Sequence, residues 1–231
     1  MPRPIRVLYE DDSFVVFDKP PHLVVTPAPG ESRSTLTERV NSQRTDQHPY
    51  RLHPCHRLDR ETSGAIIFAK GKKNQQVMMR QFQKGAVSKT YVAFVRGSVK
   101  NSRGEIRRPL RDHYQKTFAR RSRPKSAVTR YQRLFIRKDY SVMKVSPLTG
   151  RTHQIRIHFR DIGHPLLGER LYAFRKDFQV DCKRLALHLN EVRWQQPITH
   201  KKVMVTSDLP EDMKAFLKKT GHTKKRNELI R

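Results

Sequence analysis

Acidic residues are scarce in this chain of 231 residues: 21 Asp and Glu stand against 49 Lys and Arg, giving a formal net charge of +28. Such an excess indicates a polyanionic partner, and nucleic acid is the first candidate because Lys and Arg neutralise phosphates. Long apolar runs are missing too, since no stretch approaches the roughly 18 consecutive apolar residues of a membrane-spanning helix. The sequence therefore predicts a nucleic-acid-binding protein with no membrane partner.

Cysteine is almost absent. Cys55 and Cys182 are the only two, they are far apart in the sequence, and the first six residues lack the apolar stretch of a signal peptide. A reduced, cytoplasmic setting is the simplest interpretation. The hydrophobic content of 35% is low but gathers in short runs, which is typical of a globular chain with a polar surface.

The apolar runs and turn residues predict strands mixed with a few short helices. Asn74 is the expected cap of the second helix, and a polar loop is expected from Arg44 through Pro54. Because there is no regular alternation of strand and helix, we expect an α+β fold with a mixed, largely antiparallel sheet flanked by short helices. The predicted strands cover residues 7–9, 14–17, 65–69, 91–95, 128–135, 140–145 and 184–194, and the predicted helices cover 35–43, 74–84, about 151–161 and 211–219.

One carboxylate lies among arginines in the segment His-Arg-Leu-Asp-Arg-Glu-Thr-Ser-Gly, residues 56–64. Asp59 follows Leu58 and precedes the apolar run 65–69, so we expect it in a turn beside the start of a buried strand. Arg57 and Arg60 flank it and favour its ionised form, which a nucleophile requires. The alternative is a structural aspartate that pairs with Arg57 in a tight turn.

A basic, turn-rich stretch runs from Arg107 to Arg130, with Asp112 as its only acid and Tyr114 and Phe118 interleaved. It is either a solvated basic loop or a loop that holds phosphates and stacks on a base. We favour the second, with these expected RNA-binding arginines: Arg107, Arg108, Arg120, Arg121 and Arg123.

The segment from Thr149 to His158 begins with a Thr-Gly turn and predicts a helix that ends near Asp161. Arg156 and Arg160 are four residues apart and would share one face of that helix. The segment is either a basic amphipathic helix packed on a sheet or the source of an arginine, Arg156, that holds a catalytic carboxylate ionised. Arg151 is a further expected RNA contact.

The sequence contains few groups that could bind a metal ion or act as a hydrolytic triad. His53, Cys55 and His56 lie close together, but zinc sites use a matching second pair, which this cluster lacks. A two-metal nuclease needs several convergent carboxylates, and the few present are scattered. A Ser-His-Asp arrangement with Ser63 and His56 lacks a nucleophile-elbow sequence. The sequence therefore predicts no metal site.

These motifs together resemble the RluA-type pseudouridine synthases. The Asp59 segment resembles the active-site signature of that family, and further segments match in the same order over about residues 7–210. The matching segments are Asp18-Lys19-Pro20 with 24–30, Lys89-Thr90-Tyr91-Val92-Ala93, 125–129, 149–158, Gly163-His164-Pro165 with Gly168 and Tyr172, and 184–188.

The resemblance implies a pseudouridine synthase fold and the isomerisation of uridine to pseudouridine in rRNA or tRNA, without a cofactor or metal. It implies that Asp59 is the nucleophile, that Tyr91 stacks on the flipped base and takes part in proton transfer, and that Arg156 pairs with Asp59. Arg57 would occupy the space that the flipped nucleotide leaves. Asp59, Tyr91 and Arg156 are thus the expected catalytic residues.

The resemblance also implies a domain organisation. We expect a catalytic domain over residues 1–210, a terminal helix and basic tail over 211–231, no separate amino-terminal RNA-binding domain, and a monomer. Two departures from the family pattern are Thr26, where relatives often have His, and the segment 197–202, which replaces a Gly-containing turn and puts the last hairpin in doubt. The rival from another class is a non-catalytic RNA-binding or ribosome-associated protein with the same fold.

Overall fold

The computed structural model describes residues 4–27, 34–44, 50–111, 123–173, 180 and 182–220. The chain forms two compact units, one from Met1–Ser88 and Leu189–Pro210 and the other from Lys89–His188 and Glu211–Ile230. Each combines antiparallel strands with short helices, so the predicted α+β class is confirmed. Within the described residues, none of the helices has the length and apolar character needed to span a membrane.

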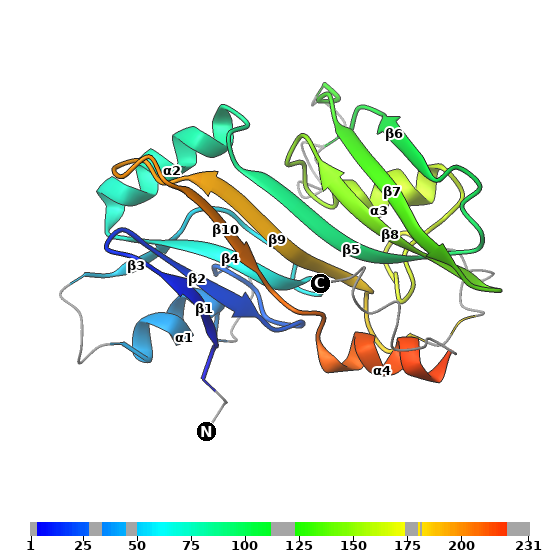
Figure 1. Cartoon of the computed structure of the whole chain (residues 1–231), viewed down its shortest axis with the longest axis horizontal. Helices are drawn as coiled ribbons and strands as arrows, with labels where there is room; N and C mark the ends of the chain where they lie inside the picture. Colours follow the sequence, from blue (N-terminus) through cyan, green and yellow to red (C-terminus); the bar gives the residue numbers. More distant parts are fainter. Residues whose placement is uncertain are drawn as a thin grey trace. The chain divides into compact units, whose positions relative to one another are not determined.

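The first unit is built on β2 (Phe14–Lys19) and β4 (Ser63–Lys70), which pair antiparallel. Ala65 to Ala69 are fully buried, which confirms the predicted buried strand. The other elements are β1 (Val7–Glu10), β3 (Leu52–Pro54), most of β9 (Leu187–Gln195), β10 (Lys202–Thr206), α1 (Leu36–Ser42) and α2 (Lys72–Gln83) (Figure 1).

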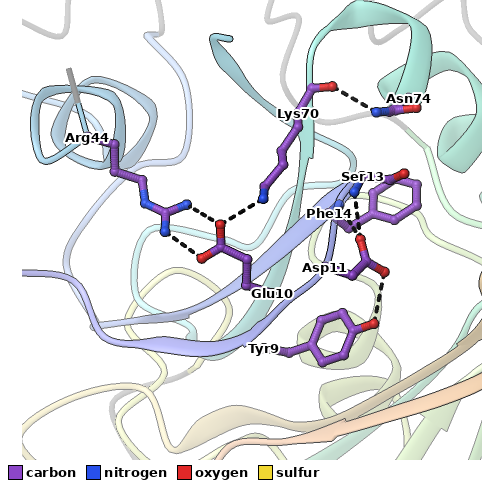
Figure 2. Close-up of polar contacts among 8 residues, drawn as sticks. All are labelled: Tyr9, Glu10, Asp11, Ser13, Phe14, Arg44, Lys70 and Asn74. Atoms are coloured by element: carbon purple, nitrogen blue, oxygen red, sulfur yellow. Dashed lines mark hydrogen bonds and ion pairs between the residues drawn. The ribbon is translucent and has the colours of Figure 1, made fainter. Parts of the chain in front are cut away.

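Local side-chain contacts shape the first hairpin of this unit. The Asp11 carboxylate accepts hydrogen bonds from the backbone N–H groups of Ser13 and Phe14, each at 2.7 Å, and from the Tyr9 hydroxyl at 2.8 Å. These bonds satisfy the turn between β1 and β2 (Figure 2). The strands predicted over residues 7–9 and 14–17 are therefore confirmed, and they pair as a hairpin.

Glu10, at the end of β1, ties three elements together. Its carboxylate accepts both guanidinium bonds of Arg44, which follows α1, and pairs with the Lys70 ammonium at 2.8 Å at the end of β4 (Figure 2). These bonds, chiefly the one from Arg44, lower the pKa of Glu10 to about 2. The ion pairs fix an edge strand to the rest of the unit.

The second unit contains four antiparallel strands in the order β5-β8-β7-β6. Helix α3 packs on β7 and β8 (Figure 1), and the ring of Phe216 in α4 lies 5.8 Å from that of Phe94 and 5.2 Å from that of Tyr140. The elements are β5 (Ser88–Arg96), β6 (Arg103–Arg107), β7 (Val128–Ile136), β8 (Tyr140–Pro147), α3 (Gln154–Asp161) and α4 (Glu211–Lys219).

Four sequence predictions need correction. Asn74 is not a helix cap: α2 begins at Lys72 after Gly71, and the Asn74 amide instead donates to the Lys70 carbonyl at 2.9 Å. The expected loop through Pro54 contains β3, whose pairing with β4 outweighs its polar sequence. The last long strand begins at Leu187 and not at Arg184. Strands β6 and β10 were missed because edge strands carry few buried residues.

The hairpin that the 197–202 segment put in doubt does form. Strands β9 and β10 pair antiparallel from Gln195–Lys202 to Glu191–Thr206. The Gln196 side chain accepts from the N–H groups of Ile198 and Thr199 at 2.6 and 2.8 Å, and His200 takes the left-handed conformation, with φ of 56°. A glutamine and a left-handed histidine thus replace the glycine turn.

Candidate active-site residues

The predicted nucleophile lies in a tight turn of the first unit. The Thr62 N–H donates to the Asp59 carbonyl at 3.1 Å, directly before β4, as the sequence predicted. Leu58 is buried and anchors the turn, Asp59 is half-buried, and Arg57 and Arg60 are exposed. The chain therefore presents a carboxylate at the edge of the core between two solvated arginines.

A buried lysine stabilises this turn through a hydrogen bond to its backbone. Lys19 is fully buried at the end of β2, and its ammonium donates to the carbonyls of Arg60, Pro20 and Leu23 at 3.1, 3.0 and 2.6 Å. The bond to Arg60 fixes the backbone one residue beyond Asp59. The motif Asp18-Lys19-Pro20 did not predict this role for Lys19, although a lysine in an apolar strand is itself a signal, because buried lysines are rare.

Gly64, the last residue of the motif, is required by two constraints. Its φ of +119° is strained for residues with a side chain, and a Cβ atom there would lie 2.2 Å from the backbone oxygen of Leu189 in β9. The glycine therefore allows β4 and β9 to approach closely directly after the Asp59 turn.

The histidine and cysteine that precede the turn have structural roles. The His56 Nε2 atom accepts from the Ile67 N–H at 3.1 Å, so that nitrogen carries no proton. Burial raises the pKa of the Cys55 thiol to about 12, which keeps it protonated and a poor metal ligand. His56 and Cys55 are therefore not arranged as a pair of metal ligands.

The predicted tyrosine lies in the second unit. Tyr91 is buried in β5, opposite Val145 of β8. Tyr131 of β7 is also opposite Val145, and its ring packs 5.7 Å from that of Phe159 in α3. Directly paired residues share a sheet face, so Tyr91 lies on the face that carries α3.

Arg156 is buried in α3, and its main partner in the second unit is one that the sequence did not reveal. Its Nε and Nη2 atoms each donate to the Glu169 carboxylate at 2.7 Å, and the Glu169 side chain is completely buried. Glu169 also accepts from the backbone N–H groups of Leu171 and Tyr172 at 2.8 and 3.3 Å. Glu169 engages one edge of the planar guanidinium, and the opposite edge points away from it.

Tyr172 completes this arrangement. Its ring lies 5.3 Å from the Arg156 guanidinium and 5.6 Å from that of Arg160, which confirms that these arginines share a helix face. Its hydroxyl lies 2.7 Å from the Nδ1 atom of His153. The carboxylate in the plane and the ring on the face leave Arg156 little freedom.

Gln154 fixes the start of α3, where the sequence predicted a turn. Its buried side-chain oxygen accepts from the Thr149 hydroxyl and the Arg151 N–H at 2.7 and 3.0 Å, and its nitrogen donates to the Val128 carbonyl and the Thr129 hydroxyl at 3.0 and 2.9 Å. All four hydrogen-bonding positions of the amide are used, so α3 is joined firmly to β7.

The base of the basic stretch is attached to the same helix. Buried His158 bridges the Thr129 hydroxyl at 2.8 Å and the Arg108 carbonyl at 3.0 Å, and burial lowers its pKa, so it is neutral near pH 7. Leu110 and Ala127 pack against Ile157. Arg120 and Arg121 lie outside the described residues. The described basic side chains of this region and of the start of α3 are exposed: Arg107, Arg108, Arg111, Arg123, Lys125 and Arg151.

The family model for RNA pseudouridylate synthase matches residues 13–161. A curated relative, an uncharacterised RNA pseudouridine synthase of Aquifex aeolicus, is 39% identical over 180 residues, which are 74% of this chain and 57% of the relative. The dual-specificity RNA pseudouridine synthase RluA of Vibrio cholerae is 34% identical over 206 residues, 85% of this chain and 79% of that protein.

A solved structure has a similar fold. The human protein called RNA pseudouridylate synthase domain containing 4 superposes with a TM-score of 0.78 and 24% sequence identity, covering 93% of this chain and 92% of that one. At this identity the likeness concerns the fold alone, and it confirms the fold that the sequence motifs implied.

Proposed function

This chain belongs to the RluA-type RNA pseudouridine synthases, as the motifs predicted, and we propose that it isomerises specific uridines of rRNA or tRNA with Asp59 as the nucleophile. The observation that carries the residue assignment is the construction of the Asp59 turn. The buried Lys19 ammonium and Gly64, whose φ only glycine adopts without strain, hold a half-buried carboxylate beside Arg57 and Arg60. A solvated surface aspartate needs no such support.

The reaction rearranges one uridine without adding or removing atoms. The bond between N1 of uracil and C1′ of ribose breaks, a bond between C5 and C1′ forms, C5 loses its proton and N1 gains one. Asp59 acts either on the sugar or on the uracil ring, or it begins by removing a sugar proton. Oriented, ionised carboxylates suit each of these steps.

The other two catalytic assignments follow from their surroundings. Tyr91 offers an aromatic ring for stacking on the flipped base and a hydroxyl for transfer of the C5 proton. Arg156 is held by Glu169 on one guanidinium edge, and its opposite edge has the geometry for a second carboxylate. That this second carboxylate is Asp59 remains a prediction.

RNA capture is assigned to exposed arginines near these groups. Arg57 takes the place of the flipped nucleotide, and Arg60 is the residue directly after Asp59. The ends of the 107–130 stretch carry exposed cations, and His158 attaches this stretch to α3 through the Arg108 carbonyl. Phosphate contacts of this kind supply affinity without sequence specificity. The proposed RNA-binding set is Arg57, Arg60, Arg107, Arg108, Arg120, Arg121, Arg123 and Arg151.

We further propose that the protein works as a cytoplasmic monomer, with a catalytic domain over residues 1–210 followed by a terminal helix and basic tail over 211–231, and that it uses no cofactor or metal. The rival is a non-catalytic RNA-binding protein on the same fold. Retention of Asp59, Tyr91 and Arg156 favours the enzyme, because a binding protein does not require all three.

The test compares Asp59→Asn with the wild type. Asparagine keeps the shape of the side chain and removes its charge and nucleophilicity, so release of tritium from uracil C5 should fall to background while RNA affinity is retained. The matched control is Asp208→Asn, an exposed carboxylate of the same unit, which should keep full turnover. Turnover by a folded Asp59→Asn protein would overturn the assignment.

A further inference from the structure

The second unit has a basic sheet surface of which only Arg107 belongs to the RNA-binding set proposed above. In β6, Arg103 and Arg107 lie opposite Gln132 and Val128 of β7. In β8, Lys144 lies opposite Gln132, and Arg130 of β7 lies opposite Ser146. Because directly paired residues project from the same side of a sheet, the four basic side chains share one surface, here called the outer basic face. It consists of Arg103, Arg107, Arg130 and Lys144.

This face is on the opposite side of the sheet from α3 and Tyr91. Thr129 and Tyr131, which alternate with Arg130 along β7, contact His158 and Phe159 of α3. Successive side chains of a strand point to opposite faces, so Arg130 points away from the helix. The outer basic face is therefore separate from the surface that carries the proposed catalytic groups of this unit.

Its side chains are exposed. Among the described residues, α4 contacts the same sheet face at Phe94 and Tyr140, the end remote from the basic residues. The Arg107 and Arg130 side chains are 70% and 61% exposed, and Arg103 and Lys144 are exposed as well. A hydrophobic partner has little to bind there, whereas an anionic partner meets accessible cations.

The charges on this face are poorly balanced. Glu105 is its one acidic side chain among the described residues of β6, β7 and β8, and it pairs with both Arg107 and Arg130. Four cations against one anion leave a net charge of three positive units. Neighbouring like charges on a sheet are unfavourable in the isolated protein. A bound polyanion would remove that cost.

The size of the face fits a nucleic-acid backbone. The basic residues extend over about 13 Å along β6 and about 10 Å across three strands. Phosphates of one strand follow one another at about 3.4 Å along a duplex axis, so several fall within this area. The face lacks exposed aromatic side chains in its described residues, which argues for phosphate contacts and against base stacking.

We propose that the outer basic face binds the phosphate backbone of a duplex stem that flanks the target loop of the RNA substrate. The stem would pass around the edge strand β6, so that one RNA contacts both sides of the sheet. The proposal rests on RNA being the substrate and does not depend on the assignment of Asp59. Contacts to a stem would favour uridines in loops over uridines in unpaired strands. An unpaired strand has no adjoining duplex stem that could bind the outer basic face.

The experiment measures binding of an in vitro transcribed RNA stem–loop as a function of salt. The variant R103Q/R130Q/K144Q removes three charges, and its matched control, K72Q/K73Q/R80Q, removes three exposed charges from α2. The slope of log affinity against log salt should become shallower by about 2 to 3 in the first variant, with affinity about tenfold lower or more. The control should change the slope by less, and turnover on saturating RNA should stay near wild type in both.

Two further measurements distinguish loss of charge from loss of folding, and binding of the stem from binding of the loop. R103K/R130K keeps both charges and should bind like wild type, and a melting curve will verify that each variant is folded. An oligonucleotide of the loop alone should bind wild type and the triple glutamine variant equally. A wild-type salt slope in the triple glutamine variant, an equal loss in the α2 control, or weak binding by the lysine variant would overturn the proposal. If the wild-type protein binds the stem–loop but releases no tritium from it, that result would instead count against the proposed reaction.

Discussion

Replacing Glu169 with Gln tests whether the buried ion pair in α3 positions Arg156. Burial opposes ionisation of Glu169, but the bonds from Arg156 and from the N–H groups of Leu171 and Tyr172 outweigh it and lower its pKa. Glutamine has the same shape without the charge, so Arg156 would keep a hydrogen bond but lose its buried counter-ion. Breaking one partner of such a pair costs about 3–5 kcal/mol of unfolding free energy.

The chain offers an exposed pair of the same geometry as a control. Arg193 donates to the Glu191 carboxylate from two nitrogens, each at 2.8 Å, and the Arg193 side chain is 55% exposed. Glu191→Gln should cost less than about 1 kcal/mol, because solvent screens an exposed pair. The difference between the two variants isolates the effect of burial.

Urea unfolding gives the stability of each variant, and tritium release from uracil C5 gives kcat and KM. We expect Glu169→Gln to lower kcat roughly a hundredfold, because a misplaced catalytic group costs that much, and to leave KM nearly unchanged. Glu169→Asp keeps the charge and should restore part of kcat. Equal stability and kcat in Glu169→Gln and wild type would refute the reasoning. A loss of stability with normal kcat would make Glu169 structural only.

Three other changes test the first unit. Gly64→Ala should lower the unfolding free energy by more than about 3 kcal/mol in urea titrations, because the strained φ and the contact with Leu189 act together. Lys19→Met should lower kcat more than RNA affinity, since the Arg60 carbonyl loses its donor. The lowered pKa of Glu10 adds stability above its usual range near 4.5 that is lost as the pH falls towards 2. Glu10→Gln should therefore remove about 1 kcal/mol at pH 7 and little at pH 2, as measured by thermal unfolding.

Much of the fold was predictable from local patterns. Helix α1 was expected over residues 35–43, where the structure has a capping box of Thr35 and Glu38, and the alternation in 128–135 and 140–145 marks two paired strands. The start of α2 was misplaced because Asn74 resembles a cap, while the real first turn follows the left-handed Gly71. Edge strand β6 carries three charged residues in five, and its identity depends on pairing with β7.

The candidate site also contains residues that the sequence identified and residues that only the structure revealed. Asp59, Tyr91 and Arg156 were identifiable from sequence because each belongs to a short motif whose residue types suit the chemistry. The groups that hold them were not: Lys19 supports the Asp59 turn through Arg60, 41 residues away, and Glu169 orients Arg156 from a loop after α3. Sequence patterns report which residues share an element or a motif. Contacts between separate elements depend on strand register and burial, which only the tertiary structure decides.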